Sequence, residues 1–549
     1  MISREKKISG RFLFVQFAFL IAFFFLLLRL FYIQIYEDKF IKDKVDSRTI
    51  YKDYLHAKRG KILDRNERVL ALDITGYSLE ADLSIFFPKT TELVSLARIL
   101  NTDKNSLLED IQGKRGYIVL KKFINQEEKE SVESLGLKGL YYQRNLKRSY
   151  PQMEISSHVV GITDIDRIGI QGAELVFNRT LKGSDGDFKG IKSPIGVMEG
   201  QRNPPINGTN LKLTIDIRLQ SIAYHELKKA IFSTGAKSGS IIIVDPRNAH
   251  ILALTNFPTF NPSNRTKLKD MSTLRNRATI DIFEPGSVLK PLAMAAIIES
   301  GRVNMETLID TSPGWIKIGG YKTSDFRNYG ELTLPEIISF SSNVGMVKLC
   351  GDQNKEHLHK YFSNFGVGKL PTSIIIPSRE GFLAEHSVIT ERDKVSSCYG
   401  YGLSMSAVQI AQAYQVFANR GIFRELNLFY EEDLMSLTSE RRVLSESTNR
   451  YINKMLFKAV NSKSGTARLA RIEGLQVAGK TGTAEKLKGG IKTYTSTFSG
   501  FTPINNPKLL AVIVLHDVTG EKHSGGKVAA PIFSKVISQA LHVLESGSI

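Results

Sequence analysis

One long apolar run near the N-terminus constrains the fold of this 549-residue chain more than any other feature. Residues 12–28 contain a single polar residue, and residues 30–35 extend the run beyond Arg29. Because the hydrocarbon core of a bilayer is about 30 Å thick, about 20 apolar residues in a helix can cross it. The sequence therefore predicts a transmembrane helix over residues 12–35, preceded by a short tail over residues 1–11.

The charges on the two sides of this run predict its orientation. Residues 1–11 carry four basic residues against one acid, whereas residues 37–48 carry four of each. Since an excess of Lys and Arg stays in the cytoplasm, we expect a single-pass protein of the cytoplasmic (inner) membrane. The tail would then be cytoplasmic and everything past Tyr36 would lie on the periplasmic or extracellular side. A cleaved signal peptide is the alternative, but no small-x-small cleavage site follows the run.

The overall composition excludes several classes of protein. Lys and Arg number 74 against 55 Asp and Glu, which gives a formal net charge of +19 and indicates anionic surroundings. A bulk outside the cytoplasm argues against nucleic acid as the anionic partner. Two cysteines are too few for a disulfide-rich scaffold or a cysteine zinc cluster. The ten histidines show no HExxH or paired metal spacing, so we expect no metal and no cofactor.

The pattern of elements changes near residue 211. Residues 36–210 are charged and mixed, with short strand-like runs and a loop-like stretch over Gly183–Gly208. Beyond them, apolar spacing and turn residues predict an α+β domain over 211–549, with helices packed on one antiparallel sheet. The expected helices cover 215–231, 287–300 and 528–544; the expected strands cover 240–244, 250–257, a segment starting near 475, 493–501 and 509–517.

A serine and a lysine three residues apart begin the predicted helix 287–300, in the sequence Ser287-Val-Leu-Lys290. Spacing of three places both side chains on one helix face, so the lysine amine can reach the serine hydroxyl. A serine becomes a good nucleophile when a neighbouring base takes its proton, and a lysine is a base only when its pKa is lowered. A capping Ser with a surface Lys is the simpler interpretation. However, an idle lysine inside so apolar a helix would be unfavourable, which favours a catalytic pair.

Two further motifs follow in a fixed order. Ser341-Ser342-Asn343 lies 54 residues after Ser287, and Lys480-Thr481-Gly482-Thr483 lies another 139 residues on. Alone, the first is typical of a helix cap and the second of a turn after a strand. Together with the Ser-x-x-Lys pair, they match the set found in penicillin-binding proteins and serine β-lactamases.

The chain is similar to class B penicillin-binding proteins, the monofunctional peptidoglycan D,D-transpeptidases. Within that class it resembles the division-type, septal enzymes of the FtsI family, because Asn343 is followed by Val344-Gly345. It departs from the family pattern at Glu67, where Gly is frequent, and at Ser524. The likeness also includes Arg59-Gly60, Asp64-Arg65-Asn66, Arg148-Ser-Tyr-Pro151, His158-Val-Val-Gly161, Gly169-Ile-Gln-Gly172, Asp245-Pro246, Arg275-Asn-Arg277, Gly400-Tyr-Gly402 and Gly500-Phe-Thr-Pro503.

This resemblance implies an architecture and a set of catalytic roles. Residues 36–210 would form a membrane-proximal pedestal of the dimerisation type, and 211–549 a transpeptidase domain with the serine β-lactamase fold. Ser287 would attack the D-Ala-D-Ala carbonyl of a stem peptide and form an acyl-enzyme. Lys290 would accept its proton, and Ser341 would relay a proton to the leaving amine.

The remaining motif residues would bind the substrate. Asn343 would hold the substrate amide, and Lys480 would place positive charge near the terminal carboxylate. The hydroxyls of Thr481 and Thr483 would hydrogen-bond that carboxylate, and the backbone N–H groups of Ser287 and Thr483 would form the oxyanion hole. The implied oxyanion and substrate-binding set is Ser287, Asn343, Thr481, Gly482 and Thr483.

The resemblance also implies partners and leaves alternatives. Stem peptides would be donor and acceptor, β-lactams covalent inhibitors, and a SEDS-family glycan polymerase and other division proteins partners at the septum. An elongation-type class B enzyme shares this chemistry. A β-lactamase is less expected because no ExxLN motif lies between Ser341-Ser342-Asn343 and Lys480-Thr481-Gly482. A β-lactam sensor is less expected because residues 1–11 leave no room for an output domain. Cys350 and Cys398 could pair or remain two buried thiols.

Overall fold

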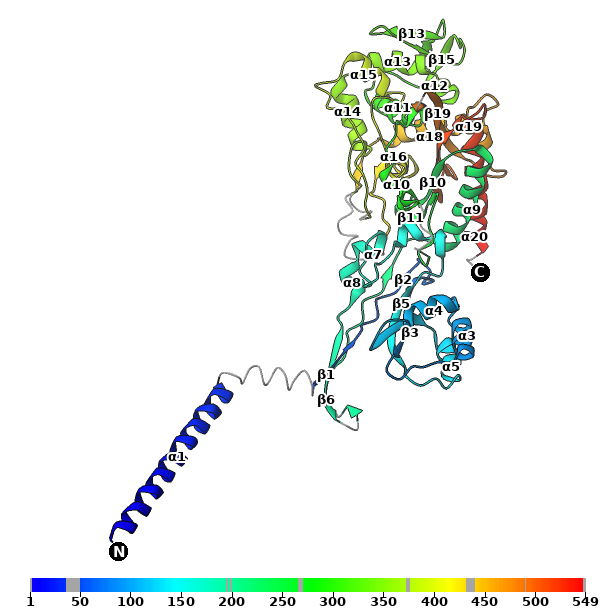
Figure 1. Cartoon of the computed structure of the whole chain (residues 1–549). Helices are drawn as coiled ribbons and strands as arrows, with labels where there is room; N and C mark the ends of the chain where they lie inside the picture. Colours follow the sequence, from blue (N-terminus) through cyan, green and yellow to red (C-terminus); the bar gives the residue numbers. More distant parts are fainter. Residues whose placement is uncertain are drawn as a thin grey trace. The chain divides into compact units, whose positions relative to one another are not determined.

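The computed structural model describes residues 2–35, 50–193, 196–197, 200–264, 270–371, 376–430, 440–488 and 490–546 (Figure 1). The chain divides into two compact units: Met1–Lys58 with Gly183–Gly208, and Arg59–Lys182 with Thr209–Ile549. The charged stretch 37–48, which entered the orientation prediction, lies outside the described residues.

The first unit contains the predicted apolar helix. Helix α1 covers Ile2–Ile35, and its segment Gly10–Ile35 is long and apolar enough to cross a membrane. The helix begins earlier than the predicted span because the Lys, Arg and Glu residues of the tail are good helix formers.

The same unit corrects one expectation. Gly183–Gly208 was expected to be a loop, but it contains strands β6 (Gly186–Ser193), β7 (Gly196–Val197) and β8 (Gln201–Asn203). Strand β1 (Ile50–Leu55) pairs antiparallel with β6, and β8 pairs with the other edge of β6. The glycines indicated a loop, but the backbone groups of β1 and β8 supply the hydrogen bonds that make this segment a strand.

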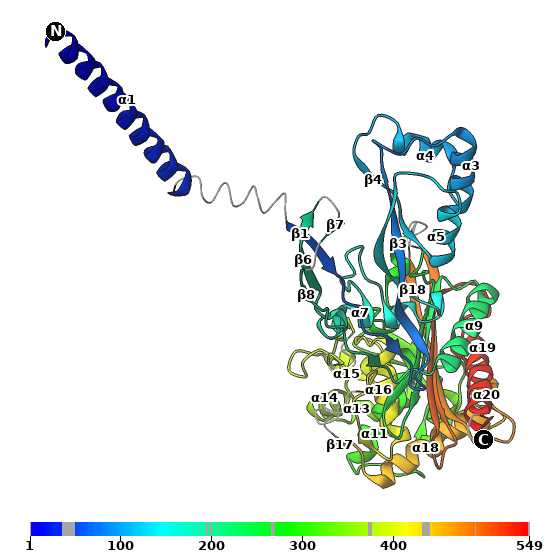
Figure 2. The same ribbon diagram turned by 90° about the horizontal axis from the view of Figure 1, so that it is seen from below.

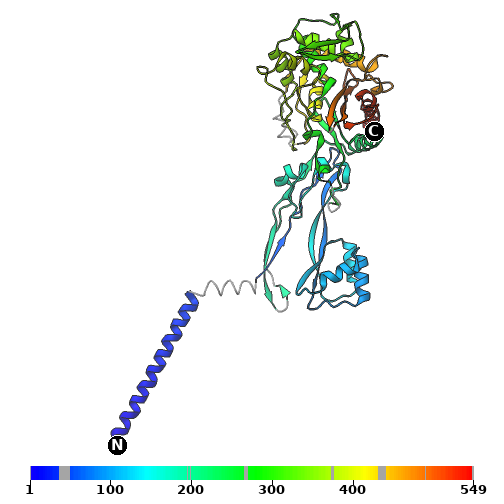
Figure 3. The ribbon, with the colours of Figure 1, turned by 45° about the horizontal axis from the view of Figure 1, so that its top comes forward.

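The second unit begins with a sheet of order β4-β3-β2-β9, in which β5 also pairs with β3. Three short helices pack against it around a cluster that includes Leu79, Leu96 and Ile124 (Figures 2 and 3). The elements are β2 (Ile62–Leu63), β3 (Val69–Asp82), α3 (Thr90–Ile99), α4 (Lys104–Ile111), β4 (Tyr117–Ile124), α5 (Gln126–Glu133), β5 (Leu140–Ser149), α6 (Ser157–Val160), α7 (Gly172–Val176), α8 (Asn178–Lys182) and β9 (Leu211–Lys212).

A buried ion-pair network joins two segments that carry the family resemblance in this part of the chain. Both oxygens of the Glu174 carboxylate are used: Arg59 Nε lies 2.5 Å from Oε2 and Arg148 Nε lies 2.7 Å from Oε1. Arg148 also contacts Asp73 at 3.2 Å. The four side chains are at most 2 % exposed, so each charge depends on its partners for stabilisation.

The five-stranded sheet of the second unit that follows residue 211 has the order β11-β10-β20-β19-β18, and all its pairings are antiparallel. Along β10, Ile241 and Ile243 belong to one hydrophobic cluster and Ile242 and Val244 to another, because successive side chains point to opposite faces. The strands are β10 (Ser238–Asp245), β11 (His250–Phe257), β18 (Ala478–Lys488), β19 (Ile491–Thr502) and β20 (Leu509–Val518). These confirm the predicted strands.

Helices cover both faces of this sheet, as the α+β prediction required. Helices α9 (Ile217–Thr234) and α20 (Ala530–Ser546) lie side by side on one face, and the mostly buried helices α11 (Lys290–Glu299) and α16 (Ala407–Ala418) lie on the other (Figures 1 and 2). The other elements are α10 (Arg277–Ile280), η4 (Gly286–Leu289), β12 (Leu308–Asp310), β13 (Trp315–Ile318), β14 (Tyr321–Ser324), β15 (Glu331–Thr333), α12 (Leu334–Phe340), α13 (Asn343–Gly351), α14 (Lys355–Asn364), α15 (Glu391–Ser397), β16 (Ile422–Phe423), β17 (Arg441–Arg442), α18 (Glu446–Asn461) and α19 (Gly525–Val528).

Two predicted helices differ in detail. The helix expected over 287–300 starts as the 3₁₀ turn η4, and the α-helix begins only at Lys290. In place of the closing helix expected over 528–544, the structure has two helices: α19 ends at Val528, and α20 begins at Ala530. The sequence left open whether Cys350 and Cys398 pair or remain free thiols; in the structure they form a disulfide bond.

Candidate active site

Ser287 lies in the 3₁₀ turn η4, where it is half-buried while its neighbours are buried. The turn is braced by the Gly400–Gly402 segment: Gly286 N donates to Gly400 O at 3.1 Å, and Gly402 N donates to Glu284 Oε1 at 3.0 Å. A Cβ on Gly400 would lie 2.0 Å from Gly286 O, so only glycine allows this approach. The brace holds the turn that carries Ser287 at a fixed position.

Lys290, at the start of α11, is fully buried. Its Nζ hydrogen-bonds Asn343 Oδ1 at 2.7 Å, Ser341 O at 2.5 Å and Ser341 Oγ at 3.2 Å. In the described part of the chain, none of its hydrogen bonds goes to Ser287 Oγ, the contact that the spacing had suggested. Burial, and secondarily the charge of Lys480, holds the pKa of Lys290 well below its usual range, so its amine is available as a base.

Ser341 occupies the junction between α12 and α13 with an unusual backbone. It caps the C-terminus of α12 in the left-handed region, with φ +62°, which is unfavourable for any residue other than glycine. This conformation lets both its carbonyl and its hydroxyl face Lys290 Nζ. Backbone strain of this kind persists only where the surrounding structure enforces it, and it is frequent at functional sites.

Asp325, which no sequence motif marks, holds the Ser341-Ser342-Asn343 motif in place through hydrogen bonds. Its carboxylate accepts hydrogen bonds from Ser342 Oγ at 2.5 Å, from Val344 N at 3.0 Å and from Asn343 N. Asn343 Nδ2 also donates to Ser324 O at 3.1 Å. A carboxylate at the first turn of a helix satisfies its free N–H groups and its dipole, and here it orients the whole motif.

Lys480, near the start of β18, is the second fully buried lysine of the site. Its Nζ donates to Ser341 Oγ at 2.9 Å and to Thr481 O at 3.1 Å. Burial lowers its pKa to about 7. Two lysine nitrogens therefore converge on one serine hydroxyl in a water-poor environment.

Strand β18 packs directly on the turn that carries Ser287. A Cβ on Gly482 would lie 2.8 Å from Pro285 O and 3.0 Å from Val288 Cγ1, so a side chain there would push the strand away. The Thr483 hydroxyl accepts a 3.0 Å hydrogen bond from Gly525 N and keeps its own proton for donation. The Thr481 hydroxyl is within 3.4 Å of Thr466 Oγ1.

A disulfide joins helix α13, which begins at Asn343, to helix α15, which precedes Gly400. Cys350 lies in α13, which begins at Asn343, and Cys398 caps α15, two residues before Gly400. The buried Lys394 of α15 adds hydrogen bonds from its Nζ to the carbonyl oxygens of Gly351, at 2.9 Å, and Gln353, at 3.0 Å. Helix α13 is thus tied to the Gly400–Gly402 segment that braces the turn of Ser287.

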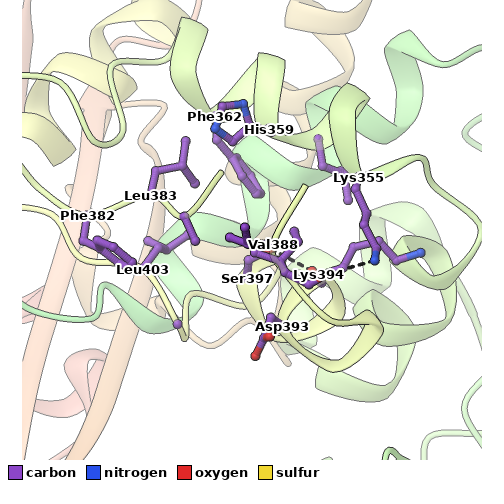
Figure 4. A pocket seen from close by; sticks show the side chains of 14 residues that line it. Lys355, His359, Phe362, Phe382, Leu383, Val388, Asp393, Lys394, Ser397 and Leu403 are labelled. Carbon is purple, nitrogen blue, oxygen red and sulfur yellow. Dashed lines mark hydrogen bonds between the residues drawn. The ribbon is translucent and has the colours of Figure 1, made fainter. Parts of the chain in front are cut away.

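A cavity of about 260 Å³ between α14 and α15 lies beside this brace. Figure 4 shows Lys355, Asp393 and Lys394 along one part of its wall and Phe382, Leu383 and Leu403 along another. None of its lining residues belongs to the three motifs, although Gly402 is shared with the brace. No group of His, Cys, Asp and Glu in the described residues has the arrangement of a metal site.

The three motifs that are far apart in the sequence thus meet at one place, where every predicted site residue is found. The sequence itself matches two protein families. The penicillin-binding protein transpeptidase domain matches residues 239–538, and the penicillin-binding protein dimerisation domain matches residues 54–213.

Curated relatives match over almost the whole chain. A probable peptidoglycan D,D-transpeptidase, PbpC of Pseudomonas aeruginosa, is 33 % identical over 98 % of this chain and 96 % of the relative. A probable peptidoglycan D,D-transpeptidase, PenA of Neisseria gonorrhoeae, is 31 % identical over 99 % and 95 %. The peptidoglycan D,D-transpeptidase FtsI of Escherichia coli is 30 % identical over 98 % and 92 %.

A solved structure shares the fold. A peptidoglycan synthetase from Bifidobacterium adolescentis superimposes with a TM-score of 0.69 at 24 % identity, and covers 90 % of this chain and 97 % of its own.

Proposed function

We propose that Ser287 is the nucleophile of this protein and Lys290 its general base. The premise is that the chain belongs to the penicillin-binding protein transpeptidase family and is a peptidoglycan D,D-transpeptidase. The observation that carries this assignment is the meeting of both buried lysines at Ser341 Oγ. A fold seldom buries two lysines together unless their lowered pKa values are used.

The proposed acylation step uses Ser287, Lys290 and Ser341. The Ser287 hydroxyl gives its proton to the neutral amine of Lys290 while its oxygen attacks the carbonyl between the two terminal D-Ala residues. The tetrahedral intermediate then collapses, the C–N bond breaks, and the proton returns through the Ser341 hydroxyl to the departing D-Ala amine. Because the Ser341 hydroxyl lies between Lys290 and Lys480, it can receive one proton as it releases another.

Binding groups surround the reacting carbonyl in this proposal. The backbone N–H groups of Ser287 and Thr483 form the oxyanion hole, in which each donor contributes a factor of roughly 10²–10³ in rate. Lys480 and the hydroxyls of Thr481 and Thr483 bind the terminal carboxylate, and Asn343 binds the substrate amide. The close packing of Gly482 on Pro285 supports this placement because it brings β18 next to the turn that carries Ser287.

The second half-reaction completes the cross-link. An amine of a neighbouring stem peptide attacks the acyl-enzyme carbonyl, the ester C–O bond breaks, and the proton of the amine returns to Ser287 Oγ. The products are a new amide bond and free enzyme. The same serine is the site at which β-lactams would acylate the protein.

We place the enzyme at the cytoplasmic membrane with residues 1–11 in the cytoplasm, 12–35 across the bilayer, and the 36–210 pedestal and 211–549 transpeptidase domain outside. The apolar helix Gly10–Ile35 supports the anchor. The Asn343-Val344-Gly345 sequence and the FtsI relatives support a division-type role, with a SEDS-family polymerase and other division proteins as partners. Recruitment of a fluorescent fusion to mid-cell rings tests this role, whereas lateral patches would instead support an elongation-type enzyme.

The catalytic assignment is tested by transpeptidation itself. The full chain in detergent micelles is incubated with a peptide ending in D-Ala-D-Ala and a labelled D-amino acid acceptor, and mass spectrometry follows D-Ala release and acceptor incorporation. Ser287→Ala and Lys290→Met should lose both signals, while Lys360→Met, which changes an exposed lysine of α14, should retain them. Turnover by the Ser287→Ala protein would refute the assignment.

A further inference from the structure

A basic cavity of about 620 Å³, here called the α18 cavity, lies in the second unit apart from the three motifs. Its walls come from the end of α16, the first turns of α18, the turn between β10 and β11, and the loop between β19 and β20. None of its lining residues belongs to the catalytic set. The volume falls in the range of small-molecule sites and is far larger than a single inorganic anion requires.

The charge of the α18 cavity is strongly unbalanced. Five basic side chains and one acidic side chain, Glu446, line it. Two of the cations are neutralised, since Arg247 pairs with Asp245 and Arg424 pairs with Glu440, each at 2.7 Å.

The other three cations have little compensation from the described residues. Within the described residues, the side chains of Arg420 and Lys454 form no ion pair, and Arg450 approaches Glu446 only to 4.0 Å. Cations gathered around one cavity attract anionic groups, and guanidinium groups bind carboxylates in a bidentate manner.

The wall of the α18 cavity also holds unpaired hydrogen-bond acceptors. The Nδ2 groups of Asn449 and Asn453 both donate to Phe417 O, at 3.2 and 3.1 Å. Within the described residues their Oδ1 atoms have no hydrogen-bond partner and are closed off from solvent, and the Asn449 residue is only 4 % exposed. The exposed amides of Asn505 and Asn506, which also line the cavity, offer accessible oxygens that can accept hydrogen bonds from the N–H or O–H groups of a ligand.

Apolar side chains complete the lining. Phe417 and Ala418 are buried, and Ile422, Ile504 and Pro507 are half-buried. A fitting ligand therefore combines negative charge, hydrogen-bond donors and small apolar groups. A peptide with free carboxylates, amide N–H groups and alanine methyls has all three properties.

We propose that the α18 cavity binds a carboxylate-bearing stem peptide of peptidoglycan as a second, non-catalytic site. The identity of the ligand rests on the proposed function, because the enzyme works on a polymer that carries many such peptides. Two sites on one polymer raise the effective concentration of substrate at the other site. The α18 cavity would therefore lower the KM for polymeric peptidoglycan while leaving the reaction with small donors unchanged.

The test uses the full chain in micelles with Ser287 acylated by penicillin, so that the catalytic site is closed. Calorimetry measures binding of a soluble disaccharide tetrapeptide and of the same compound with its carboxylates amidated. We expect the free-acid compound to bind the acylated protein, and both amidation and the double variant Arg420→Glu, Lys454→Glu to weaken binding at least 10-fold. The matched double variant Lys228→Glu, Lys535→Glu, which changes the charge equally on exposed parts of α9 and α20, should bind within twofold of wild type.

Kinetics provide the second readout. The Arg420→Glu, Lys454→Glu protein should show a KM for polymeric peptidoglycan raised several-fold, with kcat and the rate of penicillin acylation within twofold of wild type. Absence of binding to the acylated protein, binding that survives the double variant, or complete displacement by millimolar phosphate would overturn the proposal. Failure of penicillin to acylate the wild-type chain would instead contradict the proposed function, so the two failures are distinguishable.

Discussion

Lys290 and Lys480 donate hydrogen bonds to the same oxygen, Ser341 Oγ, at 3.2 and 2.9 Å, although 190 residues of sequence separate them. Both lysines are fully buried, and burial lowers both pKa values. Two ammonium groups this close together in a water-poor environment repel each other, and the charge of Lys480 further lowers the pKa of Lys290. Both effects shift Lys290 toward its neutral form.

The first prediction concerns stability and pH. Because the pKa of Lys480 is about 7 in the folded state and near 10.5 when unfolded, the unfolded chain binds more protons between these values. Unfolding free energy should therefore rise with pH from about 7 to about 10, and the unfavourable burial of the ammonium should be fully present below pH 7. Lys480→Met should be more stable than wild type by roughly 1–2 kcal/mol at pH 6.

Thermal melting of both proteins at pH 6 and pH 9 checks this sign. The advantage of Lys480→Met should shrink at pH 9, and its acylation by penicillin should be slower than wild type. A variant that is less stable than wild type at pH 6 would show that the buried lysine stabilises the fold.

Asp325 should act as a positioning residue. Asp325→Asn removes the negative charge that orients Asn343 and that raises the pKa of Lys290. We expect penicillin acylation to slow about 10-fold at neutral pH, since a small misplacement of a catalytic group has effects of this order. Because the pKa of Lys290 falls further, the acidic limb of the rate profile should move to lower pH. A purely structural role would slow acylation without moving that limb.

The buried ion pairs of Glu174 with Arg59 and Arg148 should contribute strongly to the free energy of unfolding of the part of the chain that they join. Glu174→Gln leaves the guanidinium groups of Arg59 and Arg148 with too little negative charge, and loss of one partner of a buried pair is worth about 3–5 kcal/mol. Limited proteolysis should detect early opening of this segment. Glu128→Gln, which breaks a partly exposed contact with Lys121 at 3.5 Å, is the control and should change stability by less than about 1 kcal/mol.

Glu67 should be replaceable by glycine with a gain in stability. It adopts φ +64°, where a residue with a side chain is disfavoured by about 1–2 kcal/mol. Its ion pair with Lys212 is exposed and contributes little. Glu67→Gly should raise the unfolding free energy by up to about 1 kcal/mol in denaturant titration, because greater freedom of glycine in the unfolded chain offsets part of the gain. A loss of stability would mean that the ion pair outweighs the backbone strain.

The sequence alone predicted much of the transpeptidase domain because its signals are local. The strands over 240–244 and 250–257 are apolar runs on either side of an Asp-Pro turn; the structure extends the first by two residues at its start and one at its end and leaves the second unchanged. The three motifs were recognisable because each is short and the order is fixed. Periodicity could not show the change from a 3₁₀ turn to an α-helix at Lys290, since both conformations fit the same residues.

Features that depend on distant partners were not predictable in this way. Strand β6, within Gly183–Gly208, exists because β1 pairs with it from more than 130 residues away, and β7 and β8 pair with β6 in turn. Asp325 resembles any other acidic residue in the sequence, and its role is visible only where it meets the N–H groups of α13. The disulfide between Cys350 and Cys398 likewise depends on how α13 and α15 pack, which spacing does not reveal.

The most direct test of the central claim, that Ser287 and the neutral Lys290 form the acylating pair, is the intact mass of the full chain during incubation with a penicillin. We expect a single added mass of one drug molecule that persists for minutes or longer, since the sequence has no ExxLN motif between Asn343 and Lys480 whose Glu could activate water. Ser287→Ala should show no added mass, and Lys290→Met should acquire it about 10²–10⁴-fold more slowly, the usual contribution of a general base. Rapid return to the unmodified mass, or full labelling of the Ser287→Ala protein, would contradict the account.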